Sequence, residues 1–507
     1  MKITRLVLIA ILLLALTVVL ASCNEGEEPE TEGTAQGTQA VTVRESAGLA
    51  FRSNGDGTCT VTGIGTCTDT DLVIPRTSPS GDAVTGVKEK AFSGCTKLKS
   101  VTVPDSVTSI GVGAFNGCAS LESITLPFVG ESKNVASSAG KQCFGYIFGT
   151  ESYTGGRATS QSYLSGMNSS QFDTYYVPNS LKTVTVMSGD IAYAAFENCL
   201  QILAINLGER VTGIGARAFS GCRKVTAIEI PDGVTSVGEN AFASCDALTS
   251  LVIPNSVTSL PKGLLTDCVA LKSLTIPFVG GTEKKGKDTY YYTFGYLFGT
   301  KKYDKGVLVQ QSYYVNEVRN TTEISYYFPK TLTSVTVTGG EIVRCAFYNC
   351  SNLTSVTLGE HVTNIGSGAF SNCSGLKSIV IPGSVARLED GAFQQCPNLP
   401  SVTIGKGVTV IGWHAFYHCS KLTSVVIPDG VTDIGVSAFE ECPSMTSVTI
   451  PGSVTVIEYF AFRDCHQLTT INFRGTKAQW NAIEKQTDWF KPAYSYTVRC
   501  TDGDLSK

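Results

Sequence analysis

Apolar residues recur along most of this chain with a fixed period, and the pattern predicts its architecture. Residues 96–118 read TKLKSVTVPDSVTSIGVGAFNGC, and residues 420–442 read SKLTSVVIPDGVTDIGVSAFEEC. In the first segment, Leu98, Val101 and Val103 follow the L-x-x-L-x-L pattern of a short strand with alternate side chains pointing inward. The next residue is a proline, which ends the strand because it cannot donate to a ladder. The rest of the unit predicts a short extended arm and then a helical turn.

Twelve cysteines mark the period. Nine of the eleven intervals between them are 23 residues, and the other two are 81 and 82. The twelve are Cys95, Cys118, Cys199, Cys222, Cys245, Cys268, Cys350, Cys373, Cys396, Cys419, Cys442 and Cys465. Such a period, with leucine-like residues at fixed offsets, is typical of a leucine-rich repeat solenoid. We therefore predict a repeat solenoid with a β-strand ladder on one face, and a buried ladder of free thiols, because cysteine is a small apolar residue.

The two long intervals contain matched insertions, at residues 128–180 and 278–330. FGYIFGT at 144–150 matches FGYLFGT at 294–300, and fourteen of the twenty tyrosines lie in the insertions. Because each insertion begins just after a strand ends, we expect it to project from one edge of the strand sheet and to wall a groove there. Tyrosine is enriched at binding surfaces, although some of these rings must pack the insertion onto the solenoid. The candidate ligand contacts are Tyr290, Tyr291, Tyr292, Tyr313, Tyr314, Tyr326 and Tyr327.

The first residues predict export and lipid attachment. Residues 1–22 combine Lys2 and Arg5 with an apolar run, which is short for a membrane span, and they end in Leu-Ala-Ser before Cys23. This pattern resembles a bacterial lipobox, so Cys23 is the predicted site of lipid attachment. The alternatives are an uncleaved membrane anchor and an ordinary signal peptide. Residues 23–45 are acidic and contain little that can pack, which predicts a flexible tether.

The folded part is expected to consist of three regions. These are an N-terminal cap with the first repeat at 46–95, the solenoid at 96–473, and a C-terminal cap at 474–507. In the last, Trp480, Ile483, Trp489 and Phe490 are the expected plug over the final apolar face. Cys59 and Cys67 either pair across a hairpin or remain free, since connectivity does not follow from sequence.

Composition and candidate chemistry point to binding and away from catalysis. The net charge is −4, which leaves no basic face for nucleic acid. The outward strand positions, such as Ser100 and Thr102, form a small, weakly polar ladder without the paired titratable groups that acid–base catalysis needs. We predict no enzyme activity, no small-molecule substrate, no cofactor and no metal. Two groups have side chains that can bind a metal ion, but we expect a solvated face at the first and a turn at the second. The first is His414, His418, Glu441 and Asp464, and the second is Asn54, Asp56, Asp69 and Asp71.

The repeat itself resembles a known class. The pattern L-x-S-[VI]-x-[IV]-P-x-x-V-T-x-I-G-x-x-A-F-x-x-C is similar to the BspA-like, or Treponema pallidum-type, leucine-rich repeats, and it covers nearly all of the chain after about residue 55. The resemblance implies a curved solenoid on an exported or surface protein, frequently linked to adhesion, without catalytic residues or cofactor. We therefore expect a lipid-anchored cell-surface protein that binds protein or glycan ligands. The alternative is a structural spacer of the cell envelope.

Overall fold

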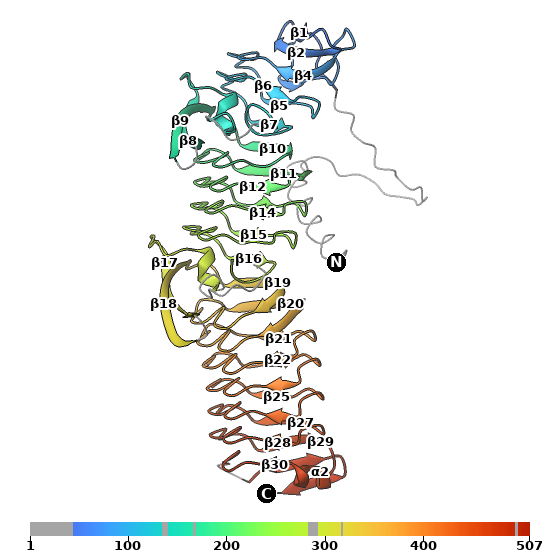
Figure 1. Cartoon of the computed structure of the whole chain (residues 1–507), viewed down its shortest axis with the longest axis vertical. Coiled ribbons are helices and arrows are strands. Elements are labelled where there is room, and N and C mark those ends of the chain that lie inside the picture. Colours follow the sequence, from blue (N-terminus) through green and yellow to red (C-terminus); the bar gives the residue numbers. More distant parts are fainter. Residues whose placement is uncertain are drawn as a thin grey trace, which may run out of the picture. The chain divides into compact units, whose positions relative to one another are not determined.

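The computed structural model describes residues 44–133, 140–165, 169–281, 293–315, 318–491 and 495–506. Within the unit Glu45–Lys507, successive turns of the chain stack on one another (Figure 1). Cys23 and most of the predicted tether lie outside the described residues. Within the described ranges, no helix is both long and apolar enough to cross a membrane.

One strand from each repeat builds the parallel ladder whose outer surface we call the strand face. Equivalent residues pair directly, as in Ser100 with Ser123 and Val101 with Ile124, so the sequence period sets the register. The strands are β3 (Asp71–Val73), β5 (Ser100–Thr102), β7 (Ser123–Leu126), β10 (Thr183–Ser188), β11 (Ala204–Arg210), β13 (Ile228–Glu229), β15 (Ser250–Val252), β16 (Ser273–Ile276), β19 (Ser334–Ile342), β20 (Ser355–Ile365), β21 (Ile379–Ile381), β23 (Val402–Ile404), β25 (Ser424–Val426), β27 (Ser447–Pro451), β29 (Thr470–Arg474) and β31 (Thr497–Cys500).

The extended arm of each repeat forms a second parallel ladder. Its strands are β6 (Ser109–Ile110), β12 (Gly213–Ile214), β14 (Ser236–Val237), β22 (Arg387–Leu388), β24 (Val410–Ile411), β26 (Asp433–Ile434), β28 (Val456–Ile457) and β30 (Glu484–Lys485). β20 belongs to both ladders, because it pairs with β19 through Ser355 and with β22 through Ile365. Its sequence, SVTLGEHVTNI, lacks the proline that ends the strand in most other repeats, so the strand continues.

Both ends of the stack carry extra elements. At the N-terminal end, β1 (Ala50–Ser53), β2 (Thr58–Gly63) and β4 (Ala83–Val87) join β6 in a four-stranded sheet. At the C-terminal end, β32 (Gly503–Ser506) pairs with β31, and α2 (Lys477–Ala482) begins in a capping box made by Thr476 and Gln479. Trp480 is buried against Phe473, and Trp489 contacts Phe462 edge-on, so these rings cover the last repeat.

The segment that ends each repeat, such as residues 111–118, contains hydrogen-bonded turns where we predicted a helical turn. The residue before the alanine and the residue before the cysteine both lie in the left-handed region, as at Gly113 (φ 61°) and Gly117 (φ 72°). Two such residues in one short segment prevent a right-handed helix from propagating. We call the stacked outer surface of these segments the turn face.

Stacked phenylalanine and cysteine columns fill the core behind the turn face. Phe370 and Phe393 stack with their centroids 5.1 Å apart and an interplanar angle of 2°, and most repeats continue this arrangement. The Cys396 thiol donates to the carbonyl of Phe370 at 3.2 Å, and the same bond joins Cys222 to Phe196 at 3.1 Å. Each such cysteine is therefore a hydrogen-bond donor between repeats, which the sequence pattern did not reveal.

Candidate functional site

The hairpin of each insertion lies beside the turn face, whereas we expected the insertions to project from the edge of the strand sheet. The second insertion contains η3 (Phe294–Leu297), whose backbone replaces the turn segment of one repeat. Leu265 donates to the carbonyl of Leu297 on one side at 2.8 Å, and Phe294 donates to that of Ala346 on the other at 2.8 Å. The FGYLFGT motif thus completes one turn of the stack, and the additional residues leave from that point. η1 (Phe144–Ile147) does the same in the first insertion.

A two-stranded hairpin follows each of these turns: β8 (Gly156–Ser165) with β9 (Ser169–Pro178), and β17 (Gly306–Val315) with β18 (Val318–Pro329). Figure 1 shows both hairpins beside the stacked turns. A buried glutamine fixes each hairpin. The Gln311 side chain accepts from the Gly295 amide at 2.6 Å and donates to the carbonyl of Ala346 at 3.2 Å. It also donates to the Cys350 sulfur at 3.5 Å, so this cysteine accepts a hydrogen bond from the hairpin.

The seven candidate tyrosines fall into different environments. Tyr326 is only 1% exposed and its hydroxyl lies 3.0 Å from the Thr293 hydroxyl, so it is a core residue and not a ligand contact. A Cβ at Gly295 would lie 2.2 Å from the Tyr326 ring, so only glycine allows this packing. Tyr327, the next residue, is half-buried, and its carbonyl accepts from the Tyr303 hydroxyl at 3.0 Å.

The other five candidates cannot be assigned contacts. Tyr313 and Tyr314 belong to β17, and their side chains are outside the described part of the chain. Tyr290, Tyr291 and Tyr292 lie wholly outside the described residues, in the gap between residues 281 and 293.

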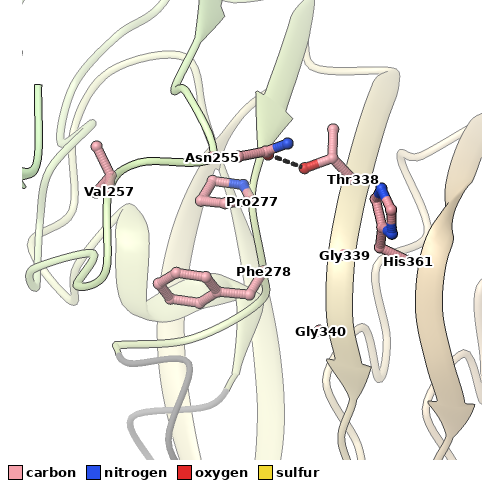
Figure 2. A pocket seen from close by; sticks show the side chains of 8 residues that line it. All are labelled: Asn255, Val257, Pro277, Phe278, Thr338, Gly339, Gly340 and His361. Carbon is pink, nitrogen blue, oxygen red and sulfur yellow. Dashed lines mark hydrogen bonds between the residues drawn. The ribbon is translucent and has the colours of Figure 1, made fainter. Parts of the chain in front are cut away.

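A pocket of about 230 Å³ opens between residues that follow β15 and β16 and residues within β19 and β20, next to the start of the second insertion. Figure 2 shows Phe278 and Pro277 on one side of it and His361 on the other. The Thr338 hydroxyl donates to the Asn255 side-chain oxygen at 2.6 Å, which joins the two sides of the pocket. The lining residues are Asn255, Val257, Pro277, Phe278, Thr338, Gly339, Gly340 and His361.

The pocket has an apolar floor and a polar rim, which can accommodate one side chain or one sugar unit of a larger ligand. Phe278 and Val257 are buried and give an apolar floor, whereas Asn255 and His361 are exposed at the rim. Gly340 (φ 75°) passes close to Phe278, and a Cβ there would lie 3.1 Å from the Phe278 Cβ. An apolar floor with a few polar groups at its edge is the usual composition of a ligand pocket.

The equivalent place beside the first insertion has different chemistry. Asp105 follows a proline as Asn255 does, and Arg210 stands in the G-E-R-V sequence that matches G-E-H-V around His361. Asp105 is ion-paired with Arg210 at 3.1 Å and with Arg76 at 2.5 Å. Hydrogen bonds from these two guanidinium groups hold the pKa of the Asp105 carboxyl below its usual value. We call each insertion, together with the strand ends beside it, a module. The two modules are thus alike in their packing and different at their strand ends.

The two groups considered as metal sites instead form hydrogen bonds and ion pairs with neighbouring residues. His418 Nδ1 lies 2.6 Å from Glu441 Oε2, while Asp464 lies 3.6 Å from Arg463. Near the start, Asp56 accepts from the amide and hydroxyl of Thr58 in the connection between β1 and β2. Among the described residues, no group of three or more histidine, cysteine or acidic side chains is placed to hold a metal ion.

Cys59 and Cys67 lie in the N-terminal cap, and both are free thiols in this structure, so they are not paired across the hairpin. The periodic cysteines are free as well, and all of them except Cys95 are buried. The ladder of reduced, buried thiols predicted from the period is therefore present in the fold.

Parallel strands in register, with one phenylalanine and one cysteine column behind them, define a leucine-rich repeat solenoid. A family model described as the BspA type leucine rich repeat region matches in six copies, over residues 76–187, 189–293 and 340–469. The matches cover more than half of the chain, so the protein belongs to the BspA-type leucine-rich repeat family, as the repeat pattern indicated. The comparison with curated proteins gave no match.

Several solved structures are similar to this chain. One is a leucine-rich repeat protein from Bacteroides ovatus, with 22% identity over 89% of this chain and 99% of that one, and a TM-score of 0.34. Another is a leucine rich cell surface protein from Faecalibacterium prausnitzii, with 22% identity over 88% and 100% of the two chains and a TM-score of 0.28. A third is the leucine-rich repeat protein of T. pallidum, with 21% identity over 49% and 80% and a TM-score of 0.20.

Proposed function

We propose that this protein is a lipid-anchored cell-surface protein that binds protein or glycan ligands beside its second insertion, and that it is not an enzyme. The observation that carries the binding proposal is the pocket between Phe278 and His361, which has an apolar floor and a polar rim. The lipobox-like sequence before Cys23 supports the anchor.

The position of the pocket favours recognition of a protruding group on a large ligand. Its rim is open to the surface at Asn255 and His361, so one side chain or one sugar unit of a ligand can enter while the rest of the ligand contacts the solenoid. Interfaces gain most of their binding energy from a few anchor residues in such pockets. Tyr290, Tyr291 and Tyr292 of the second insertion are proposed to extend the contact between the protein and its ligand.

A pair of matched variants tests the proposal. The full chain is immobilised and screened against extracellular-matrix proteins and glycans, and each binder is then measured with His361→Ala and with Arg210→Ala, its counterpart in the first module. We expect binding to weaken only with His361→Ala. Equal losses with both variants, or none with either, would refute the role of the pocket.

The second candidate function is a structural spacer, which the uninterrupted strand pairing from β3 to β20 favours because it makes a continuous stack. If the whole panel gives no saturable binding, the spacer function is the better explanation.

A further inference from the structure

A second surface of the protein exposes aromatic rings that no packing role explains. It lies on the turn face of the three repeats closed by Cys419, Cys442 and Cys465. Trp413 is 58% exposed and Tyr459 is 43% exposed, although nearly all other large apolar side chains of these repeats are buried. We call this surface the aromatic patch and define it by Trp413, His414, Tyr417, Val436, Tyr459 and Phe460.

Backbone hydrogen bonds between repeats hold the patch residues in line. Gly391 donates to the carbonyl of Trp413 at 2.7 Å, His414 donates to that of Val436 at 2.9 Å, and Ser437 donates to that of Tyr459 at 2.9 Å. Trp413, Val436 and Tyr459 therefore occupy the same position in three successive repeats. Because neighbouring strands are about 4.8 Å apart, the two exposed rings arise from backbone positions roughly 9.6 Å apart, with the smaller Val436 between them.

Bulky residues of the patch occupy backbone positions where glycine is the least strained choice. His414 has a φ of 54° and Phe460 a φ of 61°; the same position holds glycine in some repeats, as at Gly113, and larger residues in others, as at Arg217 and Asn240. A side chain in the left-handed region costs on the order of 1–2 kcal/mol, and the solenoid bears this cost at the same position in several repeats. Both rings are supported by a neighbour: His414 lies edge-on to Tyr417 at 5.5 Å, and Phe460 contacts Tyr459 at 6.3 Å.

Carboxylates outnumber cations around the patch. Glu441 accepts from the Tyr417 hydroxyl at 3.0 Å and contacts His418 at 2.6 Å, and the His418 contact lowers the pKa of the Glu441 carboxyl. Arg463 lies 3.6 Å from Asp464, 3.8 Å from Glu440 and 5.0 Å from the centre of the Phe460 ring. Asp390 accepts from the Trp413 amide at 3.0 Å. Four carboxylates, those of Asp390, Glu440, Glu441 and Asp464, thus border the patch with one arginine, Arg463, so the surplus negative charge disfavours an acidic partner.

We propose that the aromatic patch binds an extended, uncharged glycan chain. The apolar C–H face of a sugar ring stacks on an exposed aromatic ring, and Trp413 and Tyr459 offer two such platforms in line along the stack. The paired carboxylates and hydroxyls between them can exchange hydrogen bonds with sugar hydroxyl groups. The surplus carboxylates would also attract a basic peptide, so octalysine serves as the competing ligand in the test.

The test uses the full chain and its own tryptophans. Trp480 is buried and Trp489 is partly buried, so a ligand at the patch changes mainly the emission of Trp413. The chain is titrated with cellohexaose, xylohexaose, mannohexaose and chitohexaose, and affinities are confirmed by calorimetry. We expect at least one of these to shift the emission. Replacing both aromatic side chains in one double variant, Trp413→Ala with Tyr459→Ala, should lower the affinity for that hexasaccharide by about tenfold or more, as expected for aromatic anchors.

Two controls keep the outcome decisive. Val380→Ala removes a side chain that is 60% exposed and lies outside the patch, and it should bind as the unchanged chain does. Trp413→Phe keeps an aromatic platform and should retain most of the affinity. The proposal is overturned if none of the four hexasaccharides binds, if the double variant binds normally, or if octalysine binds the patch and the sugars do not. The pocket and its variants are not involved, so failure here leaves the proposed function intact.

Discussion

The thiol column offers the sharpest test of how the solenoid is held together. Cys396 is fully buried, and its thiol donates to the carbonyl of Phe370 in the preceding repeat at 3.2 Å. The same carbonyl also accepts from the Cys373 amide at 3.2 Å, so it keeps one partner when the thiol is removed. The informative changes are therefore Cys396→Ala, which removes both the sulfur and its hydrogen bond, and Cys396→Ser, which keeps a donor.

The expected magnitudes follow from the volume lost and the bond lost. Cys396→Ala deletes one buried heavy atom, which is comparable with Ile→Val at about 0.5–1.5 kcal/mol. The lost bond adds at most about 1 kcal/mol, because a thiol is a weak donor. We expect a total of about 1–2 kcal/mol. Cys396→Ser places a hydroxyl on a shorter bond among apolar neighbours, and a poorly paired buried hydroxyl costs about 1–3 kcal/mol, so serine should be no better than alanine.

The assay is urea unfolding followed by circular dichroism, combined with hydrogen exchange. In a solenoid each repeat contacts only its neighbours, so the loss should be concentrated around the changed repeat. Cys95→Ala is the matched control, because Cys95 belongs to the same column but is only partly buried, and it should have a smaller effect. If Cys396→Ser matches the unchanged chain, the sulfur is not needed for packing. If mass spectrometry finds the column mostly in disulfides, the reasoning fails altogether.

Three further predictions follow from the same structure and sequence. Burial raises the pKa of the Cys118 and Cys419 thiols from 9.0 to about 12, so the unfolded chain loses protons first as the pH rises. The contribution of these two thiols to stability should therefore be constant below pH 9 and fall by about 1.4 kcal/mol per pH unit per thiol between pH 9 and 12; equal urea midpoints at pH 8 and pH 10.5 would contradict this. Cys23→Ala should release the protein from the membrane or leave it unprocessed, as fractionation and mass measurement can show; normal retention with unchanged mass argues against lipidation. Replacing Tyr290, Tyr291 and Tyr292 with serine should weaken ligand binding with little change in the thermal transition, and a much lower transition temperature would show instead that these rings are core.

The period of the sequence was sufficient to predict the stack and its buried cysteines, because register in a solenoid repeats with the chain. It was not sufficient to locate the insertions. Leu126-Pro127 reads as the end of a strand, but the place where each insertion leaves depends on Phe144 and Phe294 completing a turn of the core, which is a tertiary contact. The thiol bonds were missed for a similar reason, since they join residues 26 positions apart in neighbouring repeats.

One error was avoidable from sequence. Successive side chains of a strand point to opposite faces, so adjacent tyrosines in a predicted strand cannot share an environment. In β18, Tyr326 and Phe328 point inward and are buried, whereas Tyr327 is half-buried. In an extended strand, alternation would have shown that Tyr326 and Tyr327 face opposite sides and are not both ligand contacts. The aromatic patch was harder to find, because Trp413, Val436 and Tyr459 are separated by 23 residues each in sequence and only stacking brings them together.

The two insertion modules allow a final test that separates packing from recognition. Gln161 and Gln311 make equivalent buried hydrogen bonds, so the hairpins are fixed in the same way. The modules differ at the strand ends, where Asp105 pairs with Arg210 in the first module.

The double change Asn255→Asp with His361→Arg transfers this ion pair to the second module, across the pocket. Exposed ion pairs contribute only about 0–1 kcal/mol, so the thermal transition should stay nearly unchanged. Ligand binding should nevertheless fall as far as it does with His361→Ala, because the new pair spans the pocket mouth. Binding that survives the double change would show that recognition lies elsewhere on the module, in the hairpin or in residues 282–292.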